Sequence, residues 1–256
     1  MSGNVQKNPW FHIPHARENP RVRLFCFCYA GGSAQIFHDW PNYLSDQIEV
    51  YAIQLPGRGS RLLEEPLVSM DALVPELCSA LESEIIVPFA FFGHSMGAQV
   101  AFELILRLRE EGKSLPSMLL VSGRRAPQLK HRKKQIYDLP DEEFKRELVR
   151  LNGTPTEILE QPELMELLGP ALRADFQLIE TWRYQSRSPI NIPIAAFGGI
   201  EDIDVSFSDL DAWSEQTESV FSVQMFQGDH FFLNTHKQEL LTRIQYLLAP
   251  EQNSIV

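Results

Sequence analysis

The sequence lacks long apolar runs: no stretch approaches the roughly 18 consecutive apolar residues that a membrane-spanning helix needs. Low-complexity tracts are also missing. The polar segment 1–23, which contains Pro9, Pro14 and Pro20, lacks the apolar core of a secretory signal peptide. These absences predict a cytoplasmic protein that does not associate with a membrane.

Cysteine is scarce, with three among 256 residues. Cys26 and Cys28 lie two residues apart in an apolar run, so both point to one face of a strand, and Cys78 falls in a helical pattern. A metal site would need further ligands nearby, and the only candidates are the loosely placed His12 and His15. We therefore expect small buried side chains, with no metal and no resident cofactor.

Positive charge is in deficit, since 23 Lys and Arg stand against 34 Asp and Glu, for a net charge of −11. Such a surface repels phosphate backbones, which argues against nucleic-acid binding. One basic cluster comprises Arg124, Arg125, Lys130, His131, Arg132, Lys133 and Lys134. Its ordinary interpretation is a solvated surface, and docking of an acidic partner is the alternative.

The length suits one domain, 1–256, and a monomer is expected. Short apolar, β-prone runs alternate with amphipathic helical patterns such as 70–86, 96–111 and 234–248. This alternation predicts an α/β protein with a mostly parallel sheet covered on both faces. The expected strands are 22–29, 49–55, 89–92, 118–122, 194–197 and 221–226.

The segment 127–186 interrupts the alternation, because it contains helical patterns but no strand signal. We predict that it is an all-helical lid over the carboxyl ends of the strands, where active sites of open α/β sheets lie. An enlarged crossover without a role in access is the alternative. Proline residues divide the segment into the predicted helices 141–151, 162–168 and 171–184.

The most informative motif is G-x-S-x-G at 93–97, which contains Ser95. It follows an apolar strand and precedes a helical pattern, as a nucleophile elbow requires, because the serine must sit on a sharp turn with its hydroxyl exposed. The glycines remove the Cβ atoms that would clash where strand and helix approach each other. The motif in this context predicts an α/β-hydrolase fold with Ser95 as the nucleophile.

A serine hydroxyl needs a base, and His230 is the predicted one among seven histidines. It follows the last predicted strand directly, so that its loop can reach the carboxyl edge of the sheet. His94 adjoins the serine, but an elbow points neighbouring side chains apart. The other histidines lie in irregular stretches or on predicted helices.

The acid of the triad should lie between serine and histidine in the chain. The run after the strand 194–197 supplies Glu201, Asp202 and Asp204. The loop after the preceding strand, 122–127, has no carboxylate. We favour Asp202, with Asp204 next and Glu201 last, as the group that orients His230 and stabilises its imidazolium form.

Two backbone N–H groups are the expected oxyanion hole. One belongs to Met96, the residue after the nucleophile, and the other to the glycine-containing loop 30–33, where Ala30 is the favoured donor.

Several motifs together closely resemble the type II thioesterases that accompany polyketide synthases and nonribosomal peptide synthetases. They are Y-A-G-G-S at 29–33, Q-L-P-G-R at 54–58, G-H-S-M-G at 93–97, S-G-R-R-A-P at 122–127 and G-D-H-F-F at 228–232. L-N-G-T-P at 151–155 and L-R-A-D-F at 172–176 are similar to lid segments of that family. The resemblance extends from about residue 10 to about residue 248.

The resemblance implies a free-standing editing enzyme that hydrolyses stalled or aberrant acyl groups from the phosphopantetheine arm of acyl or peptidyl carrier domains. It also implies the triad Ser95, Asp202 and His230. Two positions depart from the family pattern: Cys28 stands where proline is frequent, and Asp229 replaces a common glycine beside the predicted base. They could alter the oxyanion loop and compete for His230, respectively.

Other functions remain open on the elbow alone. A carboxylesterase or small lipase would use the same motif on free oxygen esters, and an acyltransferase would pass the acyl group to an alcohol or amine. A non-catalytic binding protein of this fold is disfavoured, because such proteins usually lose a member of the triad. The accessory motifs favour the thioesterase.

Overall fold

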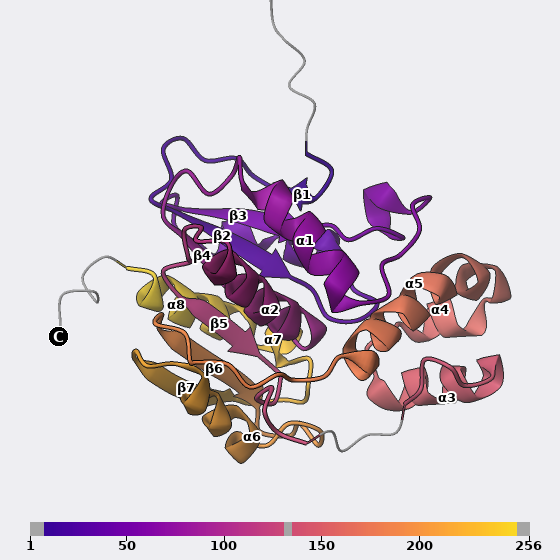
Figure 1. The fold of residues 1–256 in the computed structure, drawn as a ribbon. Coiled ribbons are helices and arrows are strands. Elements are labelled where there is room, and N and C mark those ends of the chain that lie inside the picture. Colours follow the sequence, from indigo (N-terminus) through magenta and orange to yellow (C-terminus); the bar gives the residue numbers. More distant parts are fainter. Residues whose placement is uncertain (1–7, 131–134, 250–256) are drawn as a thin grey trace, which may run out of the picture.

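The computed structural model describes residues 8–130 and 135–249, built around a seven-stranded sheet in the order β1-β3-β2-β4-β5-β6-β7 (Figure 1). Every neighbouring pair is parallel except β1 and β3. The mostly parallel sheet predicted from the sequence is therefore confirmed. The strands are β1 (Phe11–His12), β2 (Val22–Phe27), β3 (Ile48–Ile53), β4 (Phe89–His94), β5 (Leu119–Ser122), β6 (Ile194–Gly199) and β7 (Phe221–Phe226). The sequence analysis missed β1, a two-residue edge strand too short for a periodic pattern.

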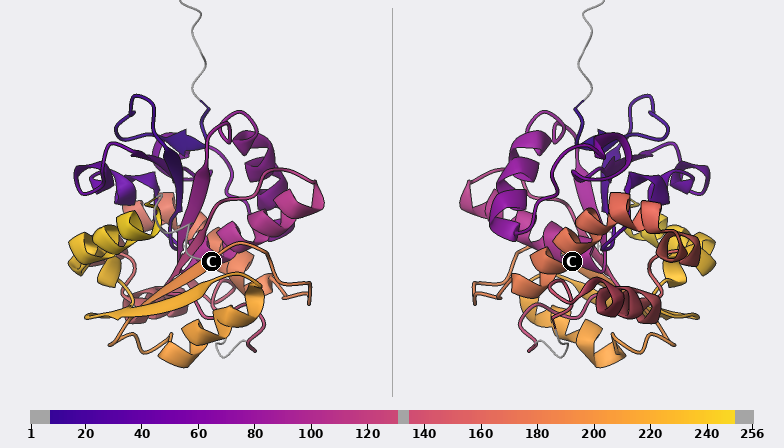
Figure 2. Two further views of the ribbon diagram at one scale, coloured as in Figure 1. Left: turned by 90° about the vertical axis from the view of Figure 1, so that its left-hand side faces the viewer. Right: turned by 90° about the vertical axis from the view of Figure 1, so that its right-hand side faces the viewer.

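Alternating side chains of the central strands enter two apolar layers. On β2, Phe25 and Phe27 pack in one layer while Leu24 and Cys26 pack in the other. The first layer is shared with α1 (Met70–Leu81) and α2 (Met96–Glu110), and the second with α8 (Lys237–Leu247). Figure 2 shows these helices on opposite sides of the sheet. The predicted coverage of both faces is thus confirmed.

Short helices complete the two layers. The predicted helix 234–248 is divided, because α7 (Phe232–Thr235) and α8 are separate helices that meet at His236. These short elements are α6 (Phe207–Asp211), α7 (Phe232–Thr235) and the 3-10 helices η1 (Ala34–Phe37), η2 (Trp40–Asn42), η3 (Gly59–Arg61) and η4 (Ala212–Gln216).

Between β5 and β6, the described residues form three helices: α3 (Asp141–Leu151), α4 (Thr156–Glu160) and α5 (Pro162–Thr181). In Figure 1 they lie to one side of the sheet, beyond its carboxyl edge. Phe144, Leu148, Leu159 and Leu172 belong to a small apolar cluster of their own. We call α3–α5 the helical insertion. Whether it acts as a lid stays a prediction.

The predicted helix break at Pro170 is wrong, because Pro170 lies inside α5, a continuous helix of 20 residues. Proline normally disfavours helical backbone at the preceding residue through a clash with that residue's Cβ. Here the preceding residue is Gly169, which has no Cβ. Pro170 still cannot donate a hydrogen bond to the carbonyl of Glu166, so α5 carries a local defect rather than an end.

Within the described ranges 8–130 and 135–249, no helix is both long enough and apolar enough to cross a membrane.

Replacing Pro170 with alanine should stabilise the protein, because the helix regains a hydrogen bond and loses a steric clash. We expect the free energy of unfolding to rise by about 2 kcal/mol, the helix-interior cost of proline less its effect on the unfolded chain. Urea denaturation measures the change. Pro162→Ala is the matched control, because proline is favoured at the first position of a helix, and a small loss is expected there. Equal effects of the two substitutions would contradict this account of α5.

Candidate active site

Ser95 lies in the sharp turn between β4 and α2 with φ 53° and ψ −112°, a conformation that side-chain-bearing residues rarely adopt. Its backbone N–H donates to the carbonyl of Ser122 on β5 at 2.8 Å. The turn therefore continues the sheet contacts of β4 by one residue while directing the Ser95 side chain away from them. Strand, strained serine and helix occur in the order predicted from the G-x-S-x-G motif.

The two glycines of the motif are required by close backbone contacts. A Cβ at Gly97 would lie 2.1 Å from the carbonyl oxygen of Phe27 on β2. A Cβ at Gly93 would lie 2.3 Å from the carbonyl oxygen of Gly97. Because each obstructing atom belongs to the backbone, no side-chain rotation could relieve the clash. The glycines thus allow α2 to begin against β2 and β4, which holds Ser95 in its turn.

His230 lies in the loop after β7, and its Nδ1 is 2.6 Å from Oδ2 of Asp202 in the loop after β6. The other carboxylate oxygen of Asp202 accepts hydrogen bonds from the backbone N–H groups of Asp204, at 2.8 Å, and Val205, at 3.1 Å. The Asp202 side chain is 1% exposed. The structure thus brings the first-ranked acid to His230, with both of its oxygens engaged.

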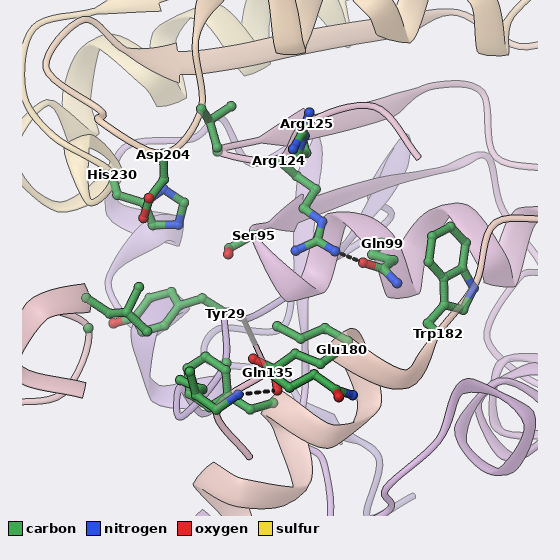
Figure 3. Close-up of a pocket in the computed structure, with 18 of the residues that line it drawn as sticks. Tyr29, Ser95, Gln99, Arg124, Arg125, Gln135, Glu180, Trp182, Asp204 and His230 are labelled. Carbon is green, nitrogen blue, oxygen red and sulfur yellow. Dashed lines mark hydrogen bonds between the residues drawn. The ribbon is translucent and has the colours of Figure 1, made fainter. Parts of the chain in front are cut away.

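Close packing brings the loops of Asp202 and His230 together. A Cβ at Gly199 would lie 2.2 Å from the carbonyl oxygen of Asp229, so only glycine fits there. The N–H of Glu201 donates to the carbonyl of Gly228 at 2.9 Å. The remaining carboxylates of the run lie differently: Glu201 is exposed, and Asp204 lines the cavity near His230 (Figure 3).

Burial of Asp202 opposes ionisation of its carboxyl group, but the hydrogen bond and charge of His230 outweigh it. Together with the backbone N–H groups of Asp204 and Val205, they hold the pKa of Asp202 below its usual value. Asp202 is therefore a carboxylate at neutral pH. Because a carboxylate faces Nδ1, a neutral His230 carries its proton on Nδ1, and Nε2 is free to accept one.

His94, the second histidine of this region, is fully buried, with its ring centroid 5.0 Å from that of His230. Its Nδ1 is within hydrogen-bond distance of the Ser122 hydroxyl, at 2.9 Å. Burial and, to a smaller extent, the charge of nearby His230 lower the pKa of His94 well below its usual value. A neutral His94 packs beside His230 without adding a second positive charge.

Ser95 and His230 line one cavity of about 1160 Å³ between the carboxyl edge of the sheet and the helical insertion. Figure 3 shows both side chains facing this space. Ala30 also lines this cavity. Met96 is buried at the first position of α2, where N–H groups have no partner within the helix. The two predicted oxyanion donors therefore belong to the wall of this cavity and to the helix that begins directly after Ser95.

Two arginines of the predicted docking cluster are held inside the molecule. Arg124 projects into the cavity, where its guanidinium donates to Oε1 of Gln99 (Figure 3). Burial, and then the neighbouring charge of Arg125, lower the pKa of Arg124 to about 10. Arg125 forms an ion pair of 3.1 Å with buried Asp209. Neither arginine is a freely exposed surface charge.

The rest of that cluster is only partly described. Lys130 is exposed on the rim of the cavity. Four of its members, His131, Arg132, Lys133 and Lys134, lie outside the described residues.

Two residues depart from the family pattern, Cys28 and Asp229, and the structure shows the surroundings of each. Cys28 is buried at the end of β2, and burial raises the pKa of its thiol to about 12, so it behaves as a small apolar residue. Asp229 is exposed, and its carboxylate accepts a hydrogen bond from the N–H of Phe231 at 2.8 Å. In the described part of the chain, no group of three or more His, Cys, Asp or Glu side chains could hold a metal ion.

Arg58 and Asp175 have no role that the sequence predicts, although both lie in motifs that resemble the family. The structure joins them in a buried ion pair beside the loop of Ala30. The sequence also did not indicate that Gln99, near the start of α2, accepts a hydrogen bond from Arg124 in the cavity. Sequence patterns name such residues as family features but do not indicate contacts between segments more than 100 positions apart.

Comparisons with known proteins show similarity along most of the chain. Residues 22–248 match the model of the thioesterase domain family. The chain is 43% identical over 250 residues to gramicidin S biosynthesis protein GrsT of Aneurinibacillus migulanus, covering 96% of this chain and 98% of that protein.

Solved structures show the same similarity. The type II thioesterase BorB from the borrelidin biosynthetic cluster superposes with a TM-score of 0.85 at 37% identity, covering 94% of this chain and 98% of that one. YbtT, a type II thioesterase from the yersiniabactin pathway, superposes with a TM-score of 0.83 at 33% identity, covering 92% of this chain and 96% of that one.

The buried His94 should make stability depend on pH. Its folded pKa lies below the unfolded value of about 6.5, so between these values only the unfolded chain binds the proton. The free energy of unfolding should therefore fall as pH drops below about 6.5, by up to about 1.4 kcal/mol per pH unit.

Urea unfolding at pH 7.5, 6.5 and 5.5 tests this, with His94→Asn as the comparison. Asparagine retains a polar partner for Ser122 but does not titrate, so its curve should fall less steeply over this range. Parallel curves for the two proteins would show that His94 does not supply the dependence.

Proposed function

The chain belongs to the thioesterase family, and from this premise we propose that it removes acyl groups from the phosphopantetheine thioester of carrier domains in polyketide or nonribosomal peptide synthesis. The full-length similarity to GrsT and to two type II thioesterases supports this substrate class. The observation that carries the chemistry is the contact of His230 with Asp202 at the cavity that contains Ser95.

In the proposed first step, Ser95 Oγ attacks the thioester carbonyl carbon while Nε2 of His230 accepts the hydroxyl proton. The C–S bond then breaks, and His230 returns the proton to the departing pantetheine sulfur. Asp202, held as a carboxylate, keeps the proton-bearing Nδ1 of His230 in place and stabilises the imidazolium formed in between. The product of this step is an acyl ester of Ser95.

Water completes the proposed cycle. His230 accepts a proton from the water molecule that attacks the acyl ester, and then donates it to Ser95 Oγ as the carboxylic acid leaves. Backbone N–H groups of Ala30 and Met96 stabilise the negative charge on the carbonyl oxygen in both tetrahedral intermediates. The scheme uses groups of this chain alone and needs no resident cofactor.

A carrier domain is the proposed partner. The helical insertion roofs the cavity that would receive the acyl chain, and Lys130 lies at its rim. Docking through Lys130, Arg132, Lys133 and Lys134 stays a prediction, as does the monomeric state. Arg124 and Arg125 are poorer docking candidates than their sequence suggested, because each already has an internal partner.

Ser95→Ala and His230→Ala should each lower kcat by roughly 10³-fold or more, because the serine and its base act as one unit. The double variant should lose little more than either single variant. Single-turnover hydrolysis of an acyl-carrier thioester measures all three, with circular dichroism as the folding control. Near-full activity of Ser95→Ala would end the serine-hydrolase mechanism.

The acid is tested by the isosteric changes Asp202→Asn, Asp204→Asn and Glu201→Gln. Asp202→Asn should reduce kcat by roughly 10³–10⁴-fold, since an amide leaves His230 in the wrong tautomer. The exposed Glu201 serves as the matched control. If Asp204→Asn were the crippled variant, the acid would be Asp204.

Carrier-bound acyl thioesters should be better substrates than small esters, because binding energy from the carrier and its arm can position the thioester carbonyl. The test compares kcat/KM for an acyl-carrier protein, the matched acyl-N-acetylcysteamine and a p-nitrophenyl ester. Equal or higher efficiency on the oxygen ester would favour a carboxylesterase.

A further inference from the structure

A buried ion pair links the helical insertion to the loop after β3. Nη1 of Arg58 lies 2.5 Å from Oδ2 of Asp175, and Nη2 lies 2.7 Å from Oδ1, so the contact is bidentate. The two side chains are 7% and 2% exposed. Arg58 follows β3 and Asp175 lies on α5, 117 positions away. Neither side chain touches the reacting groups of the proposed mechanism.

Both members of this pair also bond to the loop that contains Ala30. The N–H of Gly31 donates to Oδ2 of Asp175 at 2.7 Å. Nη1 of Arg58 donates to the carbonyl of Gly32 at 3.2 Å. The ion pair therefore holds one N–H and one C=O of consecutive residues, which fixes the orientation of their peptide groups.

Residues 29–32 form a tight turn, in which the N–H of Gly32 donates to the carbonyl of Tyr29 at 2.9 Å. Gly31 has φ +80°, the value that a type II turn requires at its third residue. In a trans peptide the N–H points opposite to the preceding C=O, so the direction of the Ala30 N–H follows from that of the Tyr29 carbonyl. The Gly32–Tyr29 hydrogen bond therefore aims the Ala30 N–H directly, and the ion pair acts on it through Gly31 and Gly32, the residues that complete this turn.

The carboxylate of Asp175 favours this turn over its alternatives. Rotation of the peptide between Ala30 and Gly31 would replace an N–H with a carbonyl oxygen facing a buried negative charge. Arg58 faces that carboxylate: burial lowers the pKa of its guanidinium, but Asp175 raises it by more, so the guanidinium stays charged.

Packing joins α5 to the same turn. A Cβ at Gly31 would lie 2.5 Å from Cδ2 of Leu172, one helical turn before Asp175. The turn and α5 are therefore in direct contact at two points, one apolar and one charged. A displacement of α5 would withdraw both.

We propose that the Arg58–Asp175 pair is a positioning device that sets the turn 29–32 so that the Ala30 N–H points at the developing oxyanion, making a complete oxyanion hole depend on α5 being docked. This proposal rests on the oxyanion role given to Ala30 above. It assigns Arg58 and Asp175 a part in transition-state stabilisation rather than in substrate binding.

The first test replaces both charges by apolar side chains in R58M/D175L. Removing both avoids leaving one buried charge unpaired, so the fold should survive. The Gly31 N–H then loses its acceptor. We expect kcat for acyl-N-acetylcysteamine to fall by roughly 10- to 100-fold, by comparison with the effect of removing one oxyanion donor, while KM stays within about threefold.

R58M/D175N supplies the conservative rescue. It differs from R58M/D175L at one nearly isosteric side chain, whose amide oxygen can still accept from the Gly31 N–H. Most of the lost kcat should return. Should R58M/D175L fail to fold, R58M/D175S replaces it, because the shorter side chain cannot reach Gly31 from α5.

R23M/E49L is the matched control. Arg23 and Glu49 form an ion pair of 3.2 Å at the amino ends of β2 and β3, and the Glu49 side chain is 6% exposed. The pair lies at the opposite edge of the sheet from Ser95. Its loss should lower the melting temperature but leave kcat within about twofold of wild type.

A second readout is the rate at which a fluorophosphonate inactivates Ser95, since the phosphoryl oxygen of this reagent occupies an oxyanion hole whatever the natural substrate is. The rate should fall in parallel with kcat in R58M/D175L and recover in R58M/D175N. If wild type labels rapidly but does not hydrolyse acyl thioesters, the proposed substrate class fails while this inference stands. If the leucine or serine variant keeps the wild-type kcat and labelling rate, or the asparagine variant loses as much, the pair is merely structural and the inference is wrong.

Discussion

The close approach of α2 to β2 and β4 is the constraint on which the site depends. Two backbone segments meet there with no room for a Cβ at Gly93 or Gly97. This packing keeps Ser95 at φ 53°, because relaxing the serine would move the start of α2 away from the strands beneath it. The strain is local, and it is held by an apolar layer in which α2 is almost wholly buried.

A second feature is a set of buried carboxylates that bond to the loops at the C-terminal ends of the strands. Asp202 orients His230, Asp175 holds the turn at Ala30, and Asp209 pairs with Arg125 and caps α6. Each of them also accepts backbone N–H bonds from a loop at this edge. A buried carboxylate is costly unless it is fully engaged, so these groups specify single conformations for loops that would otherwise have many.

The helical insertion contacts two loops of the candidate site, the one that contains Ala30 and the one that contains His230. Leu172 packs on Gly31, and a Cβ at Gly153 would lie 2.9 Å from the ring of Phe231, next to His230. Phe231 in turn packs edge-to-face on Tyr29, with ring centroids 5.0 Å apart. The helical insertion, the loop that contains Ala30 and the loop that contains His230 therefore form one contact network at the cavity that Ser95 lines.

The amino-acid sequence by itself determined the sheet and the sharp turn at Ser95, because these depend on local patterns. Apolar runs with flanking breakers marked six of the seven strands, and the elbow motif placed Ser95. Chain order narrowed the acid to three neighbouring carboxylates. Only the tertiary structure shows that Asp202 is the one in contact with His230 Nδ1, since this depends on how the loop after β6 turns toward His230. The sequence also did not predict that α5 continues through Pro170 or that Arg124 is enclosed and bonded to Gln99. Nor did it predict the ion pair between Arg58 and Asp175, which lie 117 positions apart. Such pairings arise when separate segments pack together, and no periodicity within one segment encodes them.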